Sequence, residues 1–202
     1  MEFKKRGYKL AIVTFSFFIM LSGLVNYKKA LVTLGVFISS FMLWFHRNPN
    51  READQSGSHL SPVDGKIQEV NEDDDTIRIS IYLGLTDVHT VRSMSDTQIT
   101  SIERGGSGNY PALLKNISEK NNSLNYSFNN GDEISVFTGF LARRLVNESN
   151  TGDYVVAGDE IGFISFGSRC VIHIDKCNLD EVYVSEGDYV KSGSSVIGVK
   201  KE

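Results

Sequence analysis

Hydrophobic positions follow two different periods along the chain, which divide it into an apolar N-terminal part and a longer body. In the first part, two runs of 16 residues without a charge, Leu10–Val25 and Ala30–Phe45, are separated by only four residues. As a helix, each run would be about 24 Å long, slightly short of a usual membrane span. Amphipathic aromatic residues, which favour the membrane interface, lie at the edges of these runs: Tyr8, Tyr27 and Trp44. The pattern predicts a membrane-anchoring helical hairpin over residues 1–46, either spanning or deeply inserted.

A secretory signal peptide is the alternative for the first apolar run, because basic residues precede it. No small-x-small cleavage site follows, and a second apolar run comes at once, so the hairpin is favoured. The basic cluster at the extreme N-terminus comprises Lys4, Lys5, Arg6 and Lys9. Because positive residues stay on the cytoplasmic side, we expect both ends of the hairpin, and the body after it, on the cytoplasmic side of the cell membrane.

After a polar stretch at 47–58, interpreted as a linker, the apolar positions change to a period of two. Residues 66–70 and 76–83 alternate as half-buried strands do, and the acidic turn between them predicts a hairpin. Further strands are predicted near 124–128, 133–137, 141–147 and 160–166. One helix is predicted at Tyr110–Lys120.

A short repeat supports the same kind of fold. Gly152–Gly158 follows the pattern Gly-Asp-Tyr-Val-x-x-Gly, and Gly187–Gly193 repeats it 35 residues later. Such turn–strand units are typical of barrel-sandwich folds, although turn chemistry alone also explains them. The sequence therefore predicts a mainly β (α+β), barrel-sandwich-like body over residues 59–202, with an N-terminal hydrophobic helical hairpin.

Charge is unevenly distributed between the two parts. Residues 1–51 contain eight Lys or Arg residues and one acid, which leaves 13 basic and 24 acidic residues in 52–202. An acidic body argues against nucleic acid as a partner. A basic, apolar N-terminal part fits a soluble domain held beside an anionic membrane.

Several short segments carry side chains suited to chemistry. Asp64 lies in the turn Ser61–Gly65, which turn chemistry alone would explain. Asp87 and His89 would share one face of an extended segment, where the carboxylate could orient the imidazole for acid–base work. Arg143 and Arg144 form a basic pair, which suits binding of phosphate or carboxylate but is also common in surface ion pairs. Gly167 and Ser168 form a Gly–Ser pair, which could react but is equally typical of a β-bulge.

Taken together, these segments resemble the phosphatidylserine decarboxylase family, in particular its short, membrane-anchored branch, which includes archaetidylserine decarboxylases. The resemblance extends from Phe45 to the C-terminus. It rests on six segments in the family's order: Phe45–Pro49, Ser61–Gly65, Leu85–His89, Gly108–Ala112, Gly139–Leu145 and Phe166–Arg169.

The resemblance implies an enzyme made as a self-cleaving proenzyme. The Ser168 hydroxyl would attack the Gly167 carbonyl, and the chain would divide into 1–167 and 168–202, a heterodimer of its own large and small chains. Residue 168 would become a pyruvoyl group that forms a Schiff base with the serine amine of a phospholipid headgroup, in place of PLP and without a metal. The reaction would convert phosphatidylserine to phosphatidylethanolamine, or carry out the archaeal ether-lipid equivalent.

The resemblance also implies roles for individual residues. Asp64 matches the family's processing aspartate, and His89 matches a histidine linked to both processing and decarboxylation. Arg92 stands where longer members carry a second histidine, so we expect His89 to supply the base, with Asp64 as the alternative. Arg143 and Arg144 are candidates for the substrate phosphate or carboxylate.

Two other classes of protein agree with part of the pattern. One is a non-catalytic, membrane-anchored barrel-sandwich adaptor, and the other is a homologue that binds lipid without being processed. The sequence leaves open the lipid backbone and the oligomeric state, for which a membrane-bound homodimer is one candidate.

Overall fold

The computed structural model describes residues 2–51, 58–108, 110–111, 120–139, 144–164 and 168–199. It divides into two compact units, Met1–Asn50 and Arg51–Glu202. The division falls within the stretch 47–58 that the sequence analysis interpreted as a linker.

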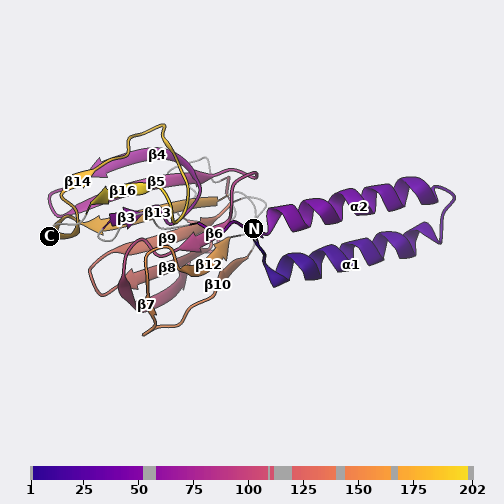
Figure 1. The fold of residues 1–202 in the computed structure, drawn as a ribbon, viewed down its shortest axis with the longest axis horizontal. Coiled ribbons are helices and arrows are strands. Elements are labelled where there is room, and N and C mark those ends of the chain that lie inside the picture. The colour runs from indigo at the N-terminus through magenta and orange to yellow at the C-terminus, as the bar shows by residue number, and fades with distance from the viewer. Residues whose placement is uncertain are drawn as a thin grey trace. The chain divides into compact units, whose positions relative to one another are not determined.

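The N-terminal unit is a helical hairpin. Helices α1 (Lys5–Ser22) and α2 (Lys28–Phe45) lie side by side and antiparallel (Figure 1). The short strands β1 (Glu2–Phe3) and β2 (Arg47–Asn48) pair at its open end. Helix α2 is long and apolar enough to cross a membrane by length and composition. The predicted hairpin is therefore confirmed, and its apolar second helix is compatible with membrane anchoring.

The helices approach each other closely at one glycine. A Cβ atom added at Gly35 would lie 2.6 Å from the Cβ of Phe18 on the other helix. Small residues allow helix backbones to pack at such short separations, as they do in membrane proteins. The packing of the hairpin thus depends on the lack of a side chain at this position.

The body consists of three antiparallel sheets (Figure 1). The largest has eight strands in the order β11-β7-β8-β9-β13-β5-β4-β15, and the two smaller sheets have the orders β10-β12-β6 and β14-β16-β3. The strands are β3 (Ser58–Leu60), β4 (Gly65–Glu72), β5 (Thr76–Leu83), β6 (Thr90–Arg92), β7 (Thr97–Gly105), β8 (Ser123–Phe128), β9 (Glu133–Thr138), β10 (Leu145–Asn147), β11 (Tyr154–Val155), β12 (Glu160–Ile164), β13 (Ser168–Asp175), β14 (Glu181–Val182), β15 (Tyr189–Val190) and β16 (Val196–Val199), with a 3₁₀ turn η1 at Lys176–Asn178.

Apolar side chains from all three sheets form one core, to which β5, β6, β13 and β16 contribute Ile81, Val91, Ile172 and Ile197. Burial alternates along the strands, as the period of two predicts. In β9, for example, every second residue from Ile134 to Thr138 is buried, and the residues between are only partly buried. The predicted mainly β, barrel-sandwich-like body is confirmed.

Most predicted strands are present, and several of the observed strands were not predicted. The hairpin predicted at 66–70 and 76–83 is formed by β4 and β5, and the other predicted strands correspond to β8, β9, β10 and β12. The sequence analysis did not predict β7, which is rich in polar residues, or β13, whose start looked like a Gly–Ser turn. The predicted helix at 110–120 lies, apart from its ends, outside the described residues.

The two copies of the Gly-Asp-Tyr-Val repeat form the two outer strands of the large sheet, β11 and β15. Both copies begin with a glycine at positive φ, Gly152 at 94° and Gly187 at 100°. In each copy the aspartate accepts a hydrogen bond from the backbone N–H three residues before it, at 2.7 Å for Asp153 and 2.8 Å for Asp188. The repeat is therefore a structural unit that begins each edge strand.

Candidate active site

The segments singled out in the sequence adjoin one end of the large sheet. Ser168 begins β13 and lies between Leu83, the last residue of β5, and Thr138, the last residue of β9. At the same end β4 and β8 begin, and β7 ends at Gly105. The five segments quoted from the body, from Ser61–Gly65 to Phe166–Arg169, are continuous in sequence with these strand ends. The pairing register thus gathers segments that are up to about 100 residues apart in the chain.

Ser168 is fully buried, with an exposed fraction of 0%. Among the residues that the structure describes, its hydroxyl has no hydrogen-bond partner. Such a buried, unpartnered group costs about 1–3 kcal/mol and calls for an explanation. Gly167, the other half of the expected cleavage site, lies outside the described residues.

His89 is held beside the strand that leads to Ser168. Its backbone carbonyl accepts the Ile164 N–H at 2.9 Å, and its ring lies 6.5 Å, centroid to centroid, from that of Phe163. The ring nitrogen Nδ1 is 2.8 Å from the backbone carbonyl of Asp87. A carbonyl oxygen can only accept, so Nδ1 carries the proton, and in the neutral ring Nε2 carries the lone pair. His89 is thus a buried imidazole with its tautomer set by the backbone.

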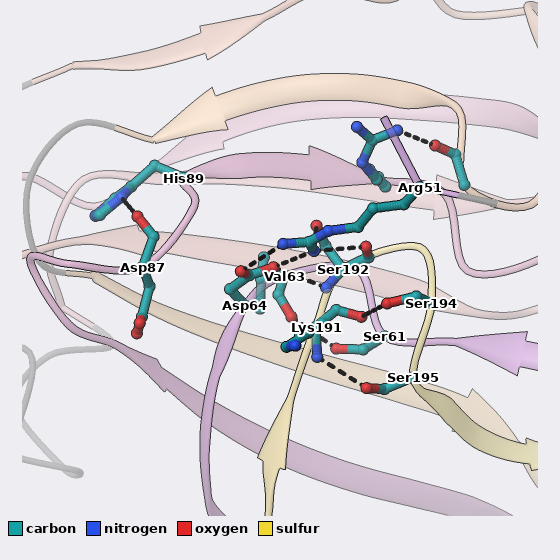
Figure 2. Close-up of polar contacts among 12 residues, drawn as sticks. Arg51, Ser61, Val63, Asp64, Asp87, His89, Lys191, Ser192, Ser194 and Ser195 are labelled. Atoms are coloured by element: carbon teal, nitrogen blue, oxygen red, sulfur yellow. Dashed lines mark hydrogen bonds and ion pairs between the residues drawn. The ribbon is translucent and has the colours of Figure 1, made fainter. Parts of the chain in front are cut away.

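Asp87 orients His89 through its backbone carbonyl and not, as the sequence analysis expected, through its carboxylate. Its backbone carbonyl orients the imidazole (Figure 2), whereas its carboxylate accepts hydrogen bonds from the Gly84 N–H and from the Tyr189 hydroxyl. The expectation assumed an extended strand, but β5 ends at Leu83 and the chain turns there, so alternation of side chains does not apply. Burial, and then the hydrogen bond to Asp87, raises the pKa of Tyr189, which remains a donor to the carboxylate.

Asp64 is clamped by a residue that the sequence analysis did not single out. Arg51 forms a bidentate pair with it, and the bond from Nη2 to Oδ2 measures 2.8 Å (Figure 2). Arg51 Nη1 also donates to the carbonyl of Ser192 at 2.8 Å and to its hydroxyl at 3.0 Å. The Ser192 N–H donates to Asp64 Oδ1 at 2.8 Å. Both carboxylate oxygens of Asp64 are therefore engaged, and the pair is largely buried, with side-chain exposures of 12% and 6%.

The glycine after Asp64 allows the strands to meet at this point. Gly65 has φ of +155°, and a Cβ atom there would lie 2.3 Å from the carbonyl oxygen of Tyr82. No other residue fits that separation without a shift of the backbone. The Asp-Gly pair of the turn thus places Asp64 at the sheet end because glycine permits close contact between β4 and β5.

A polar cleft of about 410 Å³ lies at the same sheet end. It is lined by Arg104, Gly105, Gly106, Asn122, Ser123 and Leu145. Arg144, which is exposed, directly precedes Leu145, whereas Arg143 lies outside the described residues. Arg92, which the resemblance to the family set against a second histidine of longer members, donates to the Gly158 carbonyl at 2.6 Å, and its Nη2 lies 3.5 Å from Glu160 Oε1.

Three residues of this region escaped the sequence analysis: Arg51, Arg104 and Thr138. Arg51 was part of a polar stretch taken for a linker, and Thr138 looked like an ordinary strand residue. A polar strand-end residue carries no local signal of what it will face. Only the pairing of distant strands identifies such positions.

The fold and the site together define a mainly β domain with one buried serine at the start of a central strand, flanked by loops that carry a histidine and a clamped aspartate. A family model described as phosphatidylserine decarboxylase matches residues 38–198. The chain belongs to this family, and the expectation of a decarboxylase made as a proenzyme is confirmed at that level.

Individual relatives are similar over most of their length. A phosphatidylserine decarboxylase proenzyme of Carboxydothermus hydrogenoformans is 31% identical over 89% of this chain and 88% of its own. One of Streptomyces avermitilis is 36% identical over 72% and 69%. A protein of Methanopyrus kandleri, assigned as an archaetidylserine decarboxylase proenzyme, is 31% identical over 89% and 92%.

Proposed function

We propose that this chain cleaves itself between Gly167 and Ser168 and then decarboxylates the serine headgroup of a membrane phospholipid. The observation that carries the proposal is the buried hydroxyl of Ser168, which has no hydrogen-bond partner among the described residues and lies at the start of β13, at the sheet end next to the His89 loop. In the first step the Ser168 oxygen attacks the carbonyl carbon of Gly167, and an ester replaces the peptide bond. Loss of the Cα proton of residue 168 then breaks the Cβ–O bond and releases the chain 1–167. The dehydroalanine left at residue 168 takes up water and loses ammonia, which gives the pyruvoyl group.

His89 is the proposed base for this cleavage. Its Nδ1–H is engaged by the Asp87 carbonyl, which directs the lone pair to Nε2, the nitrogen that would accept a proton. Asp64 is less suited to that task because both its oxygens already accept hydrogen bonds from Arg51 and Ser192. We propose instead that Asp64 has a structural role: with Arg51, it stabilises the end of the large sheet where β4 begins.

The site fits the pyruvoyl group that the family implies. Ser168 is fully buried between its neighbouring strands, so its hydroxyl is shielded from bulk water. The pyruvoyl group derived from Ser168 supplies an electrophilic carbonyl that condenses with the substrate amine and accepts the electron pair released as carbon dioxide leaves. His89 Nε2 would return a proton to the carbon that has lost the carboxylate.

The two chains would stay together after cleavage. Strand β13 pairs with β5 and β9, and β15 and β16 pair with β4 and β3. Segment 168–199 thus contributes strands to sheets that also contain strands from before residue 168. Arg51 adds contacts to Ser192, and Tyr189 adds one to Asp87.

The substrate is a lipid with a phosphoserine headgroup. Arg104, which lines the polar cleft, and Arg144, which precedes the lining residue Leu145 in the sequence, are cationic groups that could bind the phosphate or carboxylate of the headgroup. Arg143 remains a third candidate from the sequence. Relatives are assigned to diacyl lipids and to archaeal ether lipids, and both would present the same reacting amine. The apolar hairpin would hold the body at the cell membrane, on its cytoplasmic side.

Intact mass and a denaturing gel test the proposal. The purified wild-type chain should appear as two fragments joined at 167/168, the smaller one without a free N-terminal amine, and should release carbon dioxide from phosphatidylserine vesicles. Ser168→Ala should remain one chain without activity. A wild-type chain that stays intact after purification would exclude self-cleavage and leave an unprocessed lipid-binding protein or an adaptor.

A further inference from the structure

Strand β9 ends at Thr138, which lies directly opposite Ser168 in the antiparallel pairing of β9 with β13. Side chains at opposed positions point to the same face of the sheet, with Cβ atoms about 4.5–5.5 Å apart. Two residues further into the strands, Val136 and Cys170 are also opposed, and both belong to the buried core. Thr138 therefore presents its side chain to that of Ser168, on the core side of the sheet.

Both hydroxyl groups are fully buried, with exposed fractions of 0%. Within the part of the chain that the structure describes, neither Ser168 Oγ nor Thr138 Oγ1 has a hydrogen-bond partner. Native structures keep few such groups, and a catalytic role is one reason for keeping them. Two of them on facing strands, at the proposed cleavage site, call for a common explanation.

The backbone of Thr138 is fixed independently of its hydroxyl. Its N–H donates to the Asn122 carbonyl at 3.0 Å, and its carbonyl accepts from the side-chain amide of Asn121. That amide is fixed in turn by Tyr110, whose N–H donates to Oδ1 at 2.7 Å and whose carbonyl accepts from Nδ2 at 2.8 Å. Because threonine is stiff about χ1, these contacts leave its hydroxyl few orientations.

We propose that Thr138 donates a hydrogen bond to the Ser168 oxygen during self-cleavage, an inference that rests on the function proposed above. A hydroxyl donates one hydrogen bond and accepts two, so Ser168 can accept from Thr138 while it gives its proton to His89 Nε2. As that proton leaves, negative charge develops on the serine oxygen, and it passes to the Gly167 carbonyl oxygen once the new C–O bond has formed. A hydrogen bond that Thr138 forms to the serine oxygen as the proton leaves is charge-assisted and is therefore stronger than one between two neutral hydroxyls.

The same oxygen carries charge again in the second step. The base takes the Cα proton of residue 168, a double bond forms between Cα and Cβ, and the Cβ–O bond breaks. The oxygen leaves with the electron pair as part of the Gly167 carboxylate, and a donor aimed at it stabilises the departing group. One hydroxyl thus acts in both steps, on charge that is absent from the resting chain.

Two substitutions distinguish the effect of the Thr138 hydroxyl from the effect of the shape of its side chain. Thr138→Val keeps the shape and removes the hydroxyl, whereas Thr138→Ser keeps the hydroxyl and removes a methyl group. The full chain, made by cell-free translation with phospholipid vesicles, is followed over time on a denaturing gel. We expect cleavage to slow about 100-fold in Thr138→Val, the loss typical of one transition-state donor, and to stay near the wild-type rate in Thr138→Ser. A role in packing alone predicts the opposite order.

Stability provides a second readout. Because the Thr138 hydroxyl has no hydrogen-bond partner in the described part of the resting chain, Thr138→Val should not lower the melting temperature, measured in an uncleavable Ser168→Ala background. Ser80→Ala is the matched control: Ser80 is another fully buried hydroxyl without a partner among the described residues, but it faces Val171, deeper in the sheet. Its cleavage should match wild type.

The outcomes distinguish this inference from the proposed function. Equal cleavage rates in the wild-type and Thr138→Val chains would overturn the role of Thr138 alone. An uncleaved wild-type chain would overturn both the proposed function and the role of Thr138.

Discussion

Replacing Arg51 with Gln removes the guanidinium that joins Asp64 to Ser192, and we expect a large loss of stability. The side chains of Arg51 and Asp64 are only 12% and 6% exposed. After the substitution, Asp64 would keep the Ser192 N–H as its remaining partner among the contacts described above. Removing one partner of a buried ion pair costs about 3–5 kcal/mol, because the other charge stays buried. For a body of this size, where about 1 kcal/mol shifts the melting temperature by about 2–4 °C, the expected decrease is about 6–20 °C.

The assay is thermal unfolding of the full chain in detergent, with every variant made in the Ser168→Ala background so that cleavage does not contribute. Arg78→Gln is the control, because Arg78 forms a looser pair with Glu69 at 3.7 Å, with side-chain exposures of 23% and 30%. Exposed pairs of that kind are worth about 0.2–1 kcal/mol. Arg51→Lys should fall between Gln and wild type, since it keeps the charge and loses the bidentate geometry.

A double-mutant cycle with Asp64→Asn isolates the pair itself. If the pair is what stabilises this region, Arg51→Gln should cost much less when Asp64 has already been neutralised. A loss of stability in Arg51→Gln no larger than that in Arg78→Gln would refute the reasoning.

Two further predictions concern the site. His89→Gln can still donate to the Asp87 carbonyl but cannot accept a proton, so self-cleavage should slow by about 10²–10⁴-fold on a time-course gel. His173→Gln, further along β13, is the control. Cleavage of His89→Gln at the wild-type rate would remove His89 from the mechanism. Gly65→Ala should lower the free energy of unfolding by more than Gly152→Ala, because its Cβ would meet the Tyr82 carbonyl whereas nothing lies within 4 Å of Gly152. Equal losses of about 1–2 kcal/mol, the cost of positive φ alone, would show that close packing at Gly65 is unimportant.

Local patterns in the sequence determined a large part of the fold. The two apolar runs, the alternation at 66–70 and 76–83, and the Gly-Asp-Tyr-Val repeat each specify a hairpin, a strand pair or an edge strand. These predictions succeed because helix periodicity, strand alternation and turn chemistry depend on neighbours a few residues away. The family-like segments were recognisable for the same reason, since each is a short local motif.

The tertiary structure decided which of those residues meet. Asp64 bonds with Arg51 and, across 128 positions, with Ser192, and the carboxylate of Asp87 turns away from the nearby His89 to Tyr189, 102 positions along the chain. Thr138 faces Ser168 only because β9 and β13 pair in one particular register. Antiparallel register links residues of arbitrary separation, and burial then determines which polar groups find partners. For that reason the sequence could single out Ser168 as the proposed reacting group, whereas its neighbours became known only from the folded sheet.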